Sequence, residues 1–326
     1  MWSSQLAAVG WEERLLSLAG AYAENTIRAY RSDFADFETW CSSAELESLP
    51  ALPETVATYV EAMATMKTPA TINRRIAGIG RVHRLLGHAN PAASDLVAVA
   101  LRRVTRAEGR RQKQAAGLSG KLCDRLVAVC RDDLLGLRDQ AMISVGYDTL
   151  CRRSELVQLR AEDIEAVVDG SASILIRRSK TDQAGDGRLG YLSAETLNKV
   201  EQWLNASGIS AGPMFRTVRC SSIGEHALHP YTVTRTLKRL AKTAGLEPAL
   251  CERLSGHSMR VGAALDMAEN GIDLVPIMHA GGWKSPGLTA PIGWPGYANS
   301  GARRSSAPPP RAITLKTALP RDGRRN

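Results

Sequence analysis

Apolar residues recur every three or four positions through the first third of the chain, which is the spacing of amphipathic helices. The clearest stripe lies within residues 23–44, where Asn25 or Thr26 could cap the helix. A second helix is predicted from Pro53, because proline is tolerated in the first turn. The members of the first stripe are Ile27, Tyr30, Phe34, Phe37 and Trp40.

Two more helical patterns complete this part of the chain. Thr68 and Pro69 suit the N-cap and N1 positions of the third helix, and Gly87 is a stop signal after it. A fourth pattern covers residues 93–112 and becomes a basic connector. We therefore expect the first third of the chain to fold as an all-helical domain.

The pattern changes after residue 115. Helical periodicity is present in residues 118–130 and 134–160. Residues 163–193 alternate and are broken by glycines, which predicts short strands with turns. Helical patterns then resume and continue to residue 271. The sequence thus predicts a mainly α protein, in which an all-helical N-terminal domain precedes a mostly helical domain with a small antiparallel β-sheet.

Changes in composition suggest three regions. Residues 1–112 are expected to form the helical domain with its basic linker, and residues 113–300 the second domain. Residues 301–326 form a basic, proline-rich tail with no apolar period, a composition expected to be disordered.

Composition also excludes several classes of protein. The apolar fraction of 44% and the charged fraction of 23% are those of an ordinary globular protein. No apolar run approaches a membrane span, and Glu12 and Glu13 stand where a signal peptide would be basic. The six cysteines and six histidines show no metal-binding spacing. We expect a cytoplasmic protein with reduced, mostly buried thiols, no metal site and no membrane partner.

The net charge of +9 is concentrated at one end. Residues 301–326 hold seven bases and one acid, so a nucleic-acid surface elsewhere must rest on local patches. One patch follows the third and fourth helices and the connector, where acidic i+4 partners are mostly missing. A basic strap between domains suits a protein that closes around a phosphate backbone, although a solvated helix face explains any single arginine. The candidate DNA-binding residues are Arg74, Arg75, Arg81, Arg84, Arg103, Arg106, Arg110 and Arg111.

Three short motifs could carry chemistry. "CRRSEL" contains Arg152 and Glu155, Lys180 follows a predicted strand, and His257 and Arg260 share one helix face at i, i+3. Each alone has a plain structural explanation: a salt bridge, a solvated lysine or a chance surface pair. Together they supply what metal-free chemistry at a phosphodiester needs. Guanidinium forks bind the non-bridging oxygens, a lysine can protonate the departing oxygen, and a histidine can exchange protons with the attacking group.

These motifs, the run "GHSMRVGAALDMAENGIDLVPIMHAGGW" and the helical N-terminal domain resemble the tyrosine recombinase (phage integrase) family, and that run is most similar to its Cre-like branch. The resemblance covers roughly residues 20–285. It implies that Arg152 is the first family arginine, with Glu155 as its acidic support and Arg153 as a less favoured neighbour. The remaining positions that it implies are Lys180 for the hairpin lysine, His257 and Arg260 for the H-x-x-R box, and Trp283 for the later His or Trp.

The resemblance implies a DNA recombinase or integrase of a mobile element, acting without metal, nucleotide or other cofactor. The SAM-like N-terminal domain and the catalytic domain would lie on opposite sides of double-stranded DNA, as a dimer on one site and a tetramer in synapsis. A tyrosine would attack the scissile phosphate and form a 3′-phosphotyrosyl link with release of a 5′-hydroxyl. Trp283 would donate its indole N–H to a phosphate oxygen, and a role as a core aromatic is the alternative.

The position of the nucleophile departs from the family pattern. In the family a tyrosine follows the His or Trp position by roughly nine residues, within a short helix. The tyrosine after Trp283 in this chain is Tyr297, fourteen residues on and preceded by prolines and glycines that disfavour a helix. Either a longer loop brings Tyr297 to the site, or a frameshift after codon 283 has replaced the native end.

Two other functions remain open on the sequence. The first is a catalytically impaired, possibly frameshifted relative that binds DNA sites without strand exchange. The second is a nicking enzyme similar to type IB topoisomerases, which shares the chemistry but fits the N-terminal domain less well.

Overall fold

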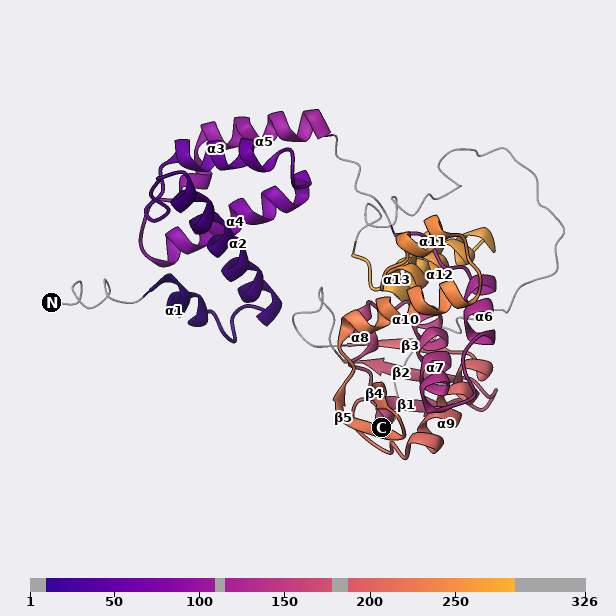
Figure 1. The fold of residues 1–326 in the computed structure, drawn as a ribbon. Helices are drawn as coiled ribbons and strands as arrows, with labels where there is room; N and C mark the ends of the chain where they lie inside the picture. The colour runs from indigo at the N-terminus through magenta and orange to yellow at the C-terminus, as the bar shows by residue number, and fades with distance from the viewer. Residues whose placement is uncertain (1–9, 109–114, 178–186, 285–326) are drawn as a thin grey trace, which may run out of the picture. The chain divides into compact units, whose positions relative to one another are not determined.

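The computed structural model describes residues 10–108, 115–177 and 187–284. The chain divides into two compact units, residues 1–112 and residues 113–326, and each is described by itself (Figure 1). The predictions made for the tail 301–326 and for four single residues lie outside the described residues. These four are Arg110, Arg111, Lys180 and Tyr297.

In the described residues of the first unit, the regular elements are helices joined by short turns and loops. Its long helices pack in two pairs, α2 against α4 and α3 against α5, as Figure 1 shows. Phe34 and Phe37 of the predicted stripe are completely buried, together with Tyr59 from α3 and Ile72 from α4. Its elements are α1 (Trp11–Leu16), α2 (Glu24–Ser43), α3 (Pro53–Met63), α4 (Pro69–Leu85), the 3₁₀ turn η2 (Pro91–Ala93) and α5 (Asp95–Glu108).

Two of the three predicted helix starts in the first unit are correct, and one is wrong. Thr68 caps α4 as predicted, because its side chain accepts a hydrogen bond from the backbone N–H of Thr71. Pro53 occupies the first turn of α3, also as predicted. The prediction for α2 is wrong, since this helix begins at Glu24 with Ala23 as its N-cap and has no side-chain cap. The carbonyl of Ala23 accepts the first backbone hydrogen bonds, so Asn25 already lies inside the helix.

The second unit is built around α7 (Leu134–Asp148), which packs against α6 (Gly120–Ala128), α9 (Ala194–Ser207) and α12 (Ser258–Glu269). Its core includes the fully buried Trp203, whose indole N–H donates to the carbonyl of Met214 (2.9 Å). The remaining helices are α8 (Arg153–Leu156), the 3₁₀ turn η3 (Ala161–Asp163), α10 (Pro230–Thr243), α11 (Pro248–Arg253) and α13 (Leu274–Gly281).

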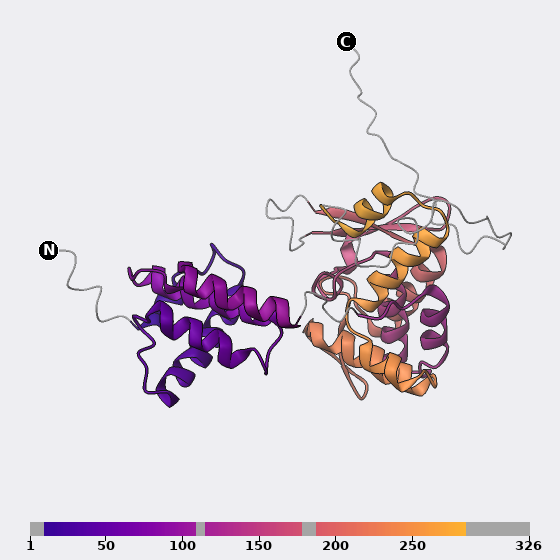
Figure 2. The same cartoon turned by 90° about the horizontal axis from the view of Figure 1, so that it is seen from above.

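The strands form two small antiparallel sheets. β1 (Ile164–Ala166), β2 (Ala172–Ile176) and β3 (Arg188–Leu192) pair in chain order, and Ile176 lies opposite Arg188. Viewed from above, these strands and α10 lie on opposite sides of the unit (Figure 2). A second sheet of β4 (Arg216–Arg219) and β5 (Ser222–Ala227) was not predicted. Its short, half-exposed strands carry no apolar alternation that sequence reasoning could detect. The predicted fold class, mainly helical with a small antiparallel sheet in the second domain, is confirmed.

Residues 115–118 run alongside the start of α12. The backbone N–H of Ala116 donates to the carbonyl of Arg253, and that of Leu118 to the carbonyl of Ser258 (2.8 Å). Gly262 allows this close approach, because a Cβ there would lie 1.9 Å from the carbonyl oxygen of Leu118. The chain that enters the second unit is therefore fixed directly to α12.

The expectation that most of the thiols are buried is confirmed. All six cysteines are free thiols, four of them buried, with Cys130 partly buried and Cys220 exposed. Within the described ranges, no helix is both long and apolar enough to cross a membrane.

Candidate active site

The bend at residues 149–152, which joins α7 to α8, is the centre of the candidate site. Leu150 has a φ of 51°, a left-handed conformation that is unusual for leucine. Its side chain is buried in a small core with Ala263, Ala264, Met267 and Ile277, which come from α12 and α13. This packing holds the bend against the two helices that carry the later motifs.

Arg152 and Glu155 are joined at the start of α8. The backbone N–H of Arg152, the N-cap residue, donates to Glu155 Oε2 (3.0 Å), and its Nη1 donates to Glu155 Oε1 (2.6 Å). A Glu at the third helical position that reaches back to the N-cap N–H is half of a capping box. The carboxylate of Glu155 is buried, so it fixes both the backbone and the guanidinium of Arg152.

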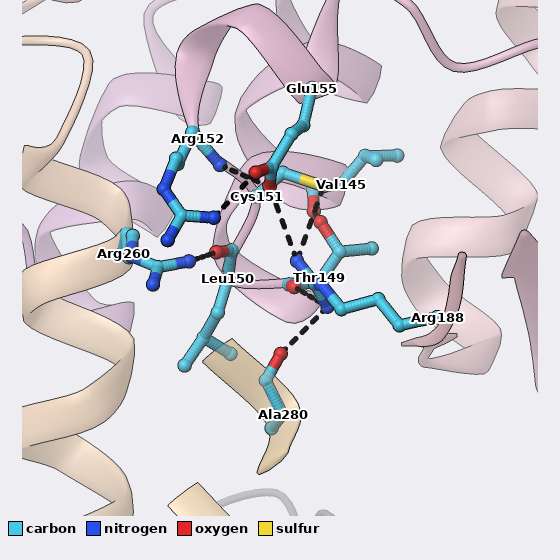
Figure 3. A network of polar contacts seen from close by, with 9 residues as sticks. All are labelled: Val145, Thr149, Leu150, Cys151, Arg152, Glu155, Arg188, Arg260 and Ala280. Carbon is cyan, nitrogen blue, oxygen red and sulfur yellow. Dashed lines mark hydrogen bonds and ion pairs between the residues drawn. The ribbon is translucent and has the colours of Figure 1, made fainter. Parts of the chain in front are cut away.

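Arg260 lies in the first turn of α12 and is almost completely buried. Its Nη1 donates to the carbonyl of Leu150 (2.5 Å), as Figure 3 shows. Its Nη2 is also buried and has no hydrogen-bond partner among the described residues. Burial and the nearby charge of Arg152 lower the pKa of Arg260 to about 9, so it stays charged at neutral pH. A buried cation with an unused donor favours an anionic ligand.

Trp283 covers the guanidinium of Arg260. Its ring centroid lies 3.9 Å from Arg260 Cζ, which is cation–π geometry. Gly282 has a φ of 63° and caps α13, and Gly281 leaves room for the indole, since a Cβ there would meet the ring at 1.9 Å. The glycines of "AGGW" therefore place the ring on Arg260. Trp283 also packs against the small core formed by Leu150 and its neighbours. Its alternative role as a core aromatic is therefore correct in part.

His257 is the N-cap residue of α12 and is exposed. The pKa of His257 is lowered. Desolvation is the largest cause, and the positive charges of Arg260, Arg153 and Arg152 add to it. A lowered pKa favours the neutral imidazole, which can accept a proton. These interactions also place it beside the two arginines of the site.

Arg188, at the start of β3, was missed by sequence reasoning. Its guanidinium reaches Glu155 Oε2 (3.5 Å), the carbonyl of Thr149 (3.1 Å) and the carbonyl of Ala280 (2.7 Å) (Figure 3). No local motif marks it, because its partners lie more than thirty positions away in the sequence.

The structure thus brings together five of the predicted site residues. They form a strongly positive cluster with one buried acid, and no group of three or more His, Cys, Asp or Glu in the described residues could hold a metal ion. Guanidinium donors around a neutral histidine suit a phosphate group. The five residues are Arg152, Glu155, His257, Arg260 and Trp283.

The predicted arginines of the first unit fall into two groups. Arg74 pairs with Asp33 (2.5 Å), Arg75 with Asp36 (2.5 Å), and Arg103 with Glu61 (3.4 Å). As expected, none of these three partners stands at the i+4 position. The acids come from other helices, Asp33 and Asp36 from α2 and Glu61 from α3.

Arg75 is the least accessible of the three paired arginines. Its side chain is 11% exposed and donates to the Tyr59 hydroxyl (2.8 Å). Arg81 lies over the Tyr22 ring at 4.9 Å, whereas Arg84 and Arg106 are exposed. The exposed pair is therefore better placed than Arg75 to meet a ligand in solvent.

The chain matches two family models in the same order as its units. Residues 118–291 match the Phage integrase family, and residues 11–90 match the Phage integrase, N-terminal SAM-like domain. The chain belongs to the phage integrase family of tyrosine recombinases, a class of DNA strand transferase. The predictions of the family, the fold class and the enzyme class are confirmed.

Individual relatives agree with this assignment. The integrase/recombinase xerD homolog of Selenomonas ruminantium is 33% identical over 271 residues, covering 79% of this chain and 77% of that protein. The recombinase cre of Escherichia phage P1 is 29% identical over 280 residues, covering 81% and 82%.

A solved structure shares the fold. The lambda integrase dimer bound to a COC′ core site, in its shorter form, superposes with a TM-score of 0.59 at 17% identity, covering 94% of this chain and 98% of that chain.

Proposed function

We propose that this chain is a site-specific recombinase that breaks and rejoins double-stranded DNA through a 3′-phosphotyrosyl intermediate, without metal or nucleotide cofactor. One observation carries the proposal. Among the described residues, the buried Arg260 keeps an unpartnered Nη2 beside the Arg152 guanidinium, which Glu155 holds in place. Two guanidinium groups held in this way are preorganised for the negative charge that grows on a phosphate in the transition state.

In the proposed reaction, a tyrosine phenol attacks the scissile phosphorus and the bond to the 5′-oxygen breaks. Arg152 and Arg260 bind the non-bridging oxygens, and Trp283 donates its indole N–H to one of them. His257, neutral because its pKa is lowered, accepts the phenol proton. Lys180 gives a proton to the departing 5′-oxygen. Attack by a 5′-hydroxyl from a second duplex reverses these steps and rejoins the strands.

The partner in this proposal is double-stranded DNA. Support comes from the lambda integrase structure, which contains a dimer bound to a core site, and from the SAM-like family match of residues 11–90. We assign DNA contact to the exposed arginines of residues 1–112 and the connector, and catalysis to residues 113–300. A dimer on each site and a tetramer in synapsis complete the proposal.

The second candidate is a relative that binds DNA sites without cutting them. The observation that favours it is the sequence position of Tyr297, the tyrosine that follows Trp283, which lies fourteen residues on among prolines and glycines. Such a protein would keep the arginine cluster for phosphate binding and would form no covalent link.

A covalent capture experiment separates the two candidates. Nicked duplexes with a randomised central region are incubated with the full chain, and DNA that stays attached to denatured protein is recovered and sequenced. Recombinase activity predicts enrichment of one sequence class, lost in Tyr297→Phe and in Arg260→Ala. DNA retained by the native protein, with none retained after denaturation, would instead identify the non-cutting relative.

A further inference from the structure

Arg188 is a buried arginine that the proposed reaction does not use. It begins β3 opposite Ile176, the last residue of β2. Its side chain is 13% exposed, and within the described residues it faces protein groups. Its Nε is buried and has no hydrogen-bond partner among the described residues. Both terminal nitrogens donate to protein groups, which offsets much of the cost of burying a guanidinium.

The guanidinium contacts three segments that are far apart in sequence. Nη1 donates to the carbonyls of Thr149 (3.1 Å) and Ala280 (2.7 Å). Nη2 donates to Cys151 Sγ (3.8 Å) and Glu155 Oε2 (3.5 Å). These groups belong to the 149–152 bend, to α8 and to the last turn of α13 (Figure 3).

Each contacted segment carries a residue of the candidate site. Glu155 holds Arg152 with its other oxygen, and Leu150, in the same bend, accepts from Arg260. Ala280 lies three residues before Trp283, whose ring covers Arg260. One side chain therefore joins the supports of Arg152, Arg260 and Trp283.

The choice of arginine follows from this geometry. The carbonyls of Thr149 and Ala280 lie at the C-terminal ends of α7 and α13, where intrahelical partners are missing and a cation is favoured. A planar fork can serve two helix ends and a carboxylate at once. The ammonium of a lysine is a single point of charge on a flexible stem, so it cannot span the same set of acceptors.

We propose that Arg188 is a positioning residue, which sets Trp283 and the Glu155–Arg152 pair in one geometry around the phosphate without touching the DNA. The proposal rests on the proposed function for its effect on the reaction. The effect of Arg188 on the geometry of the site does not depend on the proposed function, because the position of Trp283 can be measured without DNA.

The test uses the full chain labelled with 5-fluorotryptophan, in which Trp283→Phe assigns the ¹⁹F resonance of Trp283 among the six tryptophans. Arg188→Met and Arg188→Lys are compared with the parent protein. Arg177→Met is the matched control, since Arg177 follows β2 of the same sheet and pairs with Asp163. We expect the ¹⁹F chemical shift of Trp283 to change in both Arg188 variants, and to change more in Arg188→Met than in Arg188→Lys. It should stay unchanged in the Arg177→Met control.

With captured DNA at saturating concentration, the rate of adduct formation should fall on the order of 100-fold in Arg188→Met and less in Arg188→Lys. DNA affinity should change less than threefold, on the order of a surface-contact effect. If Arg188→Met does not fold, the Trp283 resonance and the adduct rate of Arg188→Lys test the proposal.

An unmoved Trp283 resonance in the folded variants overturns the proposal, even if their thermal midpoints fall, because that result would leave only a stabilising role. A moved resonance with an unchanged rate also overturns it. If the parent chain forms no adduct, the proposed function fails and the resonance alone decides the role of Arg188.

Discussion

At the scale of single residues, the site depends on arginines whose donors are divided between protein and ligand. Arg260 uses Nη1 on the Leu150 carbonyl and leaves Nη2 buried without a partner among the described residues. Arg188 instead places both terminal nitrogens on protein groups. Two buried arginines in one cluster can therefore have different tasks, one toward the phosphate and one toward the fold.

Replacing Arg260 by lysine should preserve DNA binding and impair chemistry. Lysine keeps the charge and can reach the Leu150 carbonyl, but it cannot offer a second fixed donor to the phosphate. We expect adduct formation to slow by about 100- to 1,000-fold, the usual cost of one preorganised donor. Single-turnover rates at saturating DNA measure the effect. A rate within a few-fold of the parent would remove Arg260 from the site.

The pH dependence should report His257. Its pKa is lowered, so the neutral base is present above that value and is lost as the pH falls through it. The rate of adduct formation should therefore be flat at neutral pH and decline on the acid side, below the ordinary histidine value of about 6.5.

Arg153→Gln sharpens this prediction. Removing one positive charge beside His257 should raise its pKa and move the acid decline toward higher pH. Rates across a pH series in the parent and the variant check this. If the rate declines at the same pH in Arg153→Gln as in the parent, a group other than His257 controls the pH dependence.

Sequence reasoning found the residues whose spacing is itself informative. R-x-x-E corresponds to a helix start, and H-x-x-R to one helix turn, so Arg152, Glu155, His257 and Arg260 could be named. Arg188 could not be found, because its partners are assembled only by the tertiary fold. The acids beside Arg74 and Arg75 were missed for the same reason.

At the scale of elements, α12 is the helix on which the site depends. It carries Arg260 in its first turn, follows His257, and contacts α6, α7 and α13. Residues 115–118 lie against it, and Gly120 N and the Tyr147 hydroxyl donate to Asp266 in its later turns. The entry of the chain into the second unit and the position of Arg260 are thus coupled through one helix.

Gly262→Ala should disturb this coupling. The new Cβ would lie 1.9 Å from the Leu118 carbonyl oxygen, and backbone on both sides must shift. We expect a loss of about 1–3 kcal/mol in the free energy of unfolding, as for other overpacked positions. Gly224→Ala is the control, since its nearest contact would be an ordinary 3.6 Å. Chemical unfolding of both variants measures the difference, and equal stability would contradict the packing argument.

The elements themselves were predicted where capping and periodicity are local. Thr68, Pro53 and the stripe with Phe34 and Phe37 gave correct helices. The β4–β5 hairpin was missed, because its residues are mostly exposed and its pairing, not its side chains, defines it.

At the scale of the whole molecule, the described residues form two units with separate cores. The first unit carries the exposed Arg84 and Arg106, and the second holds the cluster around Arg260 that we propose binds the scissile phosphate. DNA affinity and chemistry should therefore respond to different substitutions.

Arg84→Gln and Arg106→Gln should each weaken DNA binding and reduce the salt dependence of affinity. Each lost phosphate contact lowers the slope of log affinity against log salt by about 1. Arg131→Gln, which removes an exposed arginine paired with Asp133 in the second unit, serves as the control. Affinities measured over a salt series test this, and identical slopes in all three variants would show that Arg84 and Arg106 do not meet the DNA.

The central claim is that this site joins a tyrosine to a DNA 3′-phosphate. Its most direct test is chemical analysis of the captured adduct, by digestion, mass spectrometry of the DNA-linked peptide and labelling of the released strand end. We expect a 3′-phosphotyrosyl peptide that contains Tyr297 and a released strand with a free 5′-hydroxyl. A link to a 5′-phosphate, a link through a residue other than tyrosine, or native DNA binding with no adduct would contradict it.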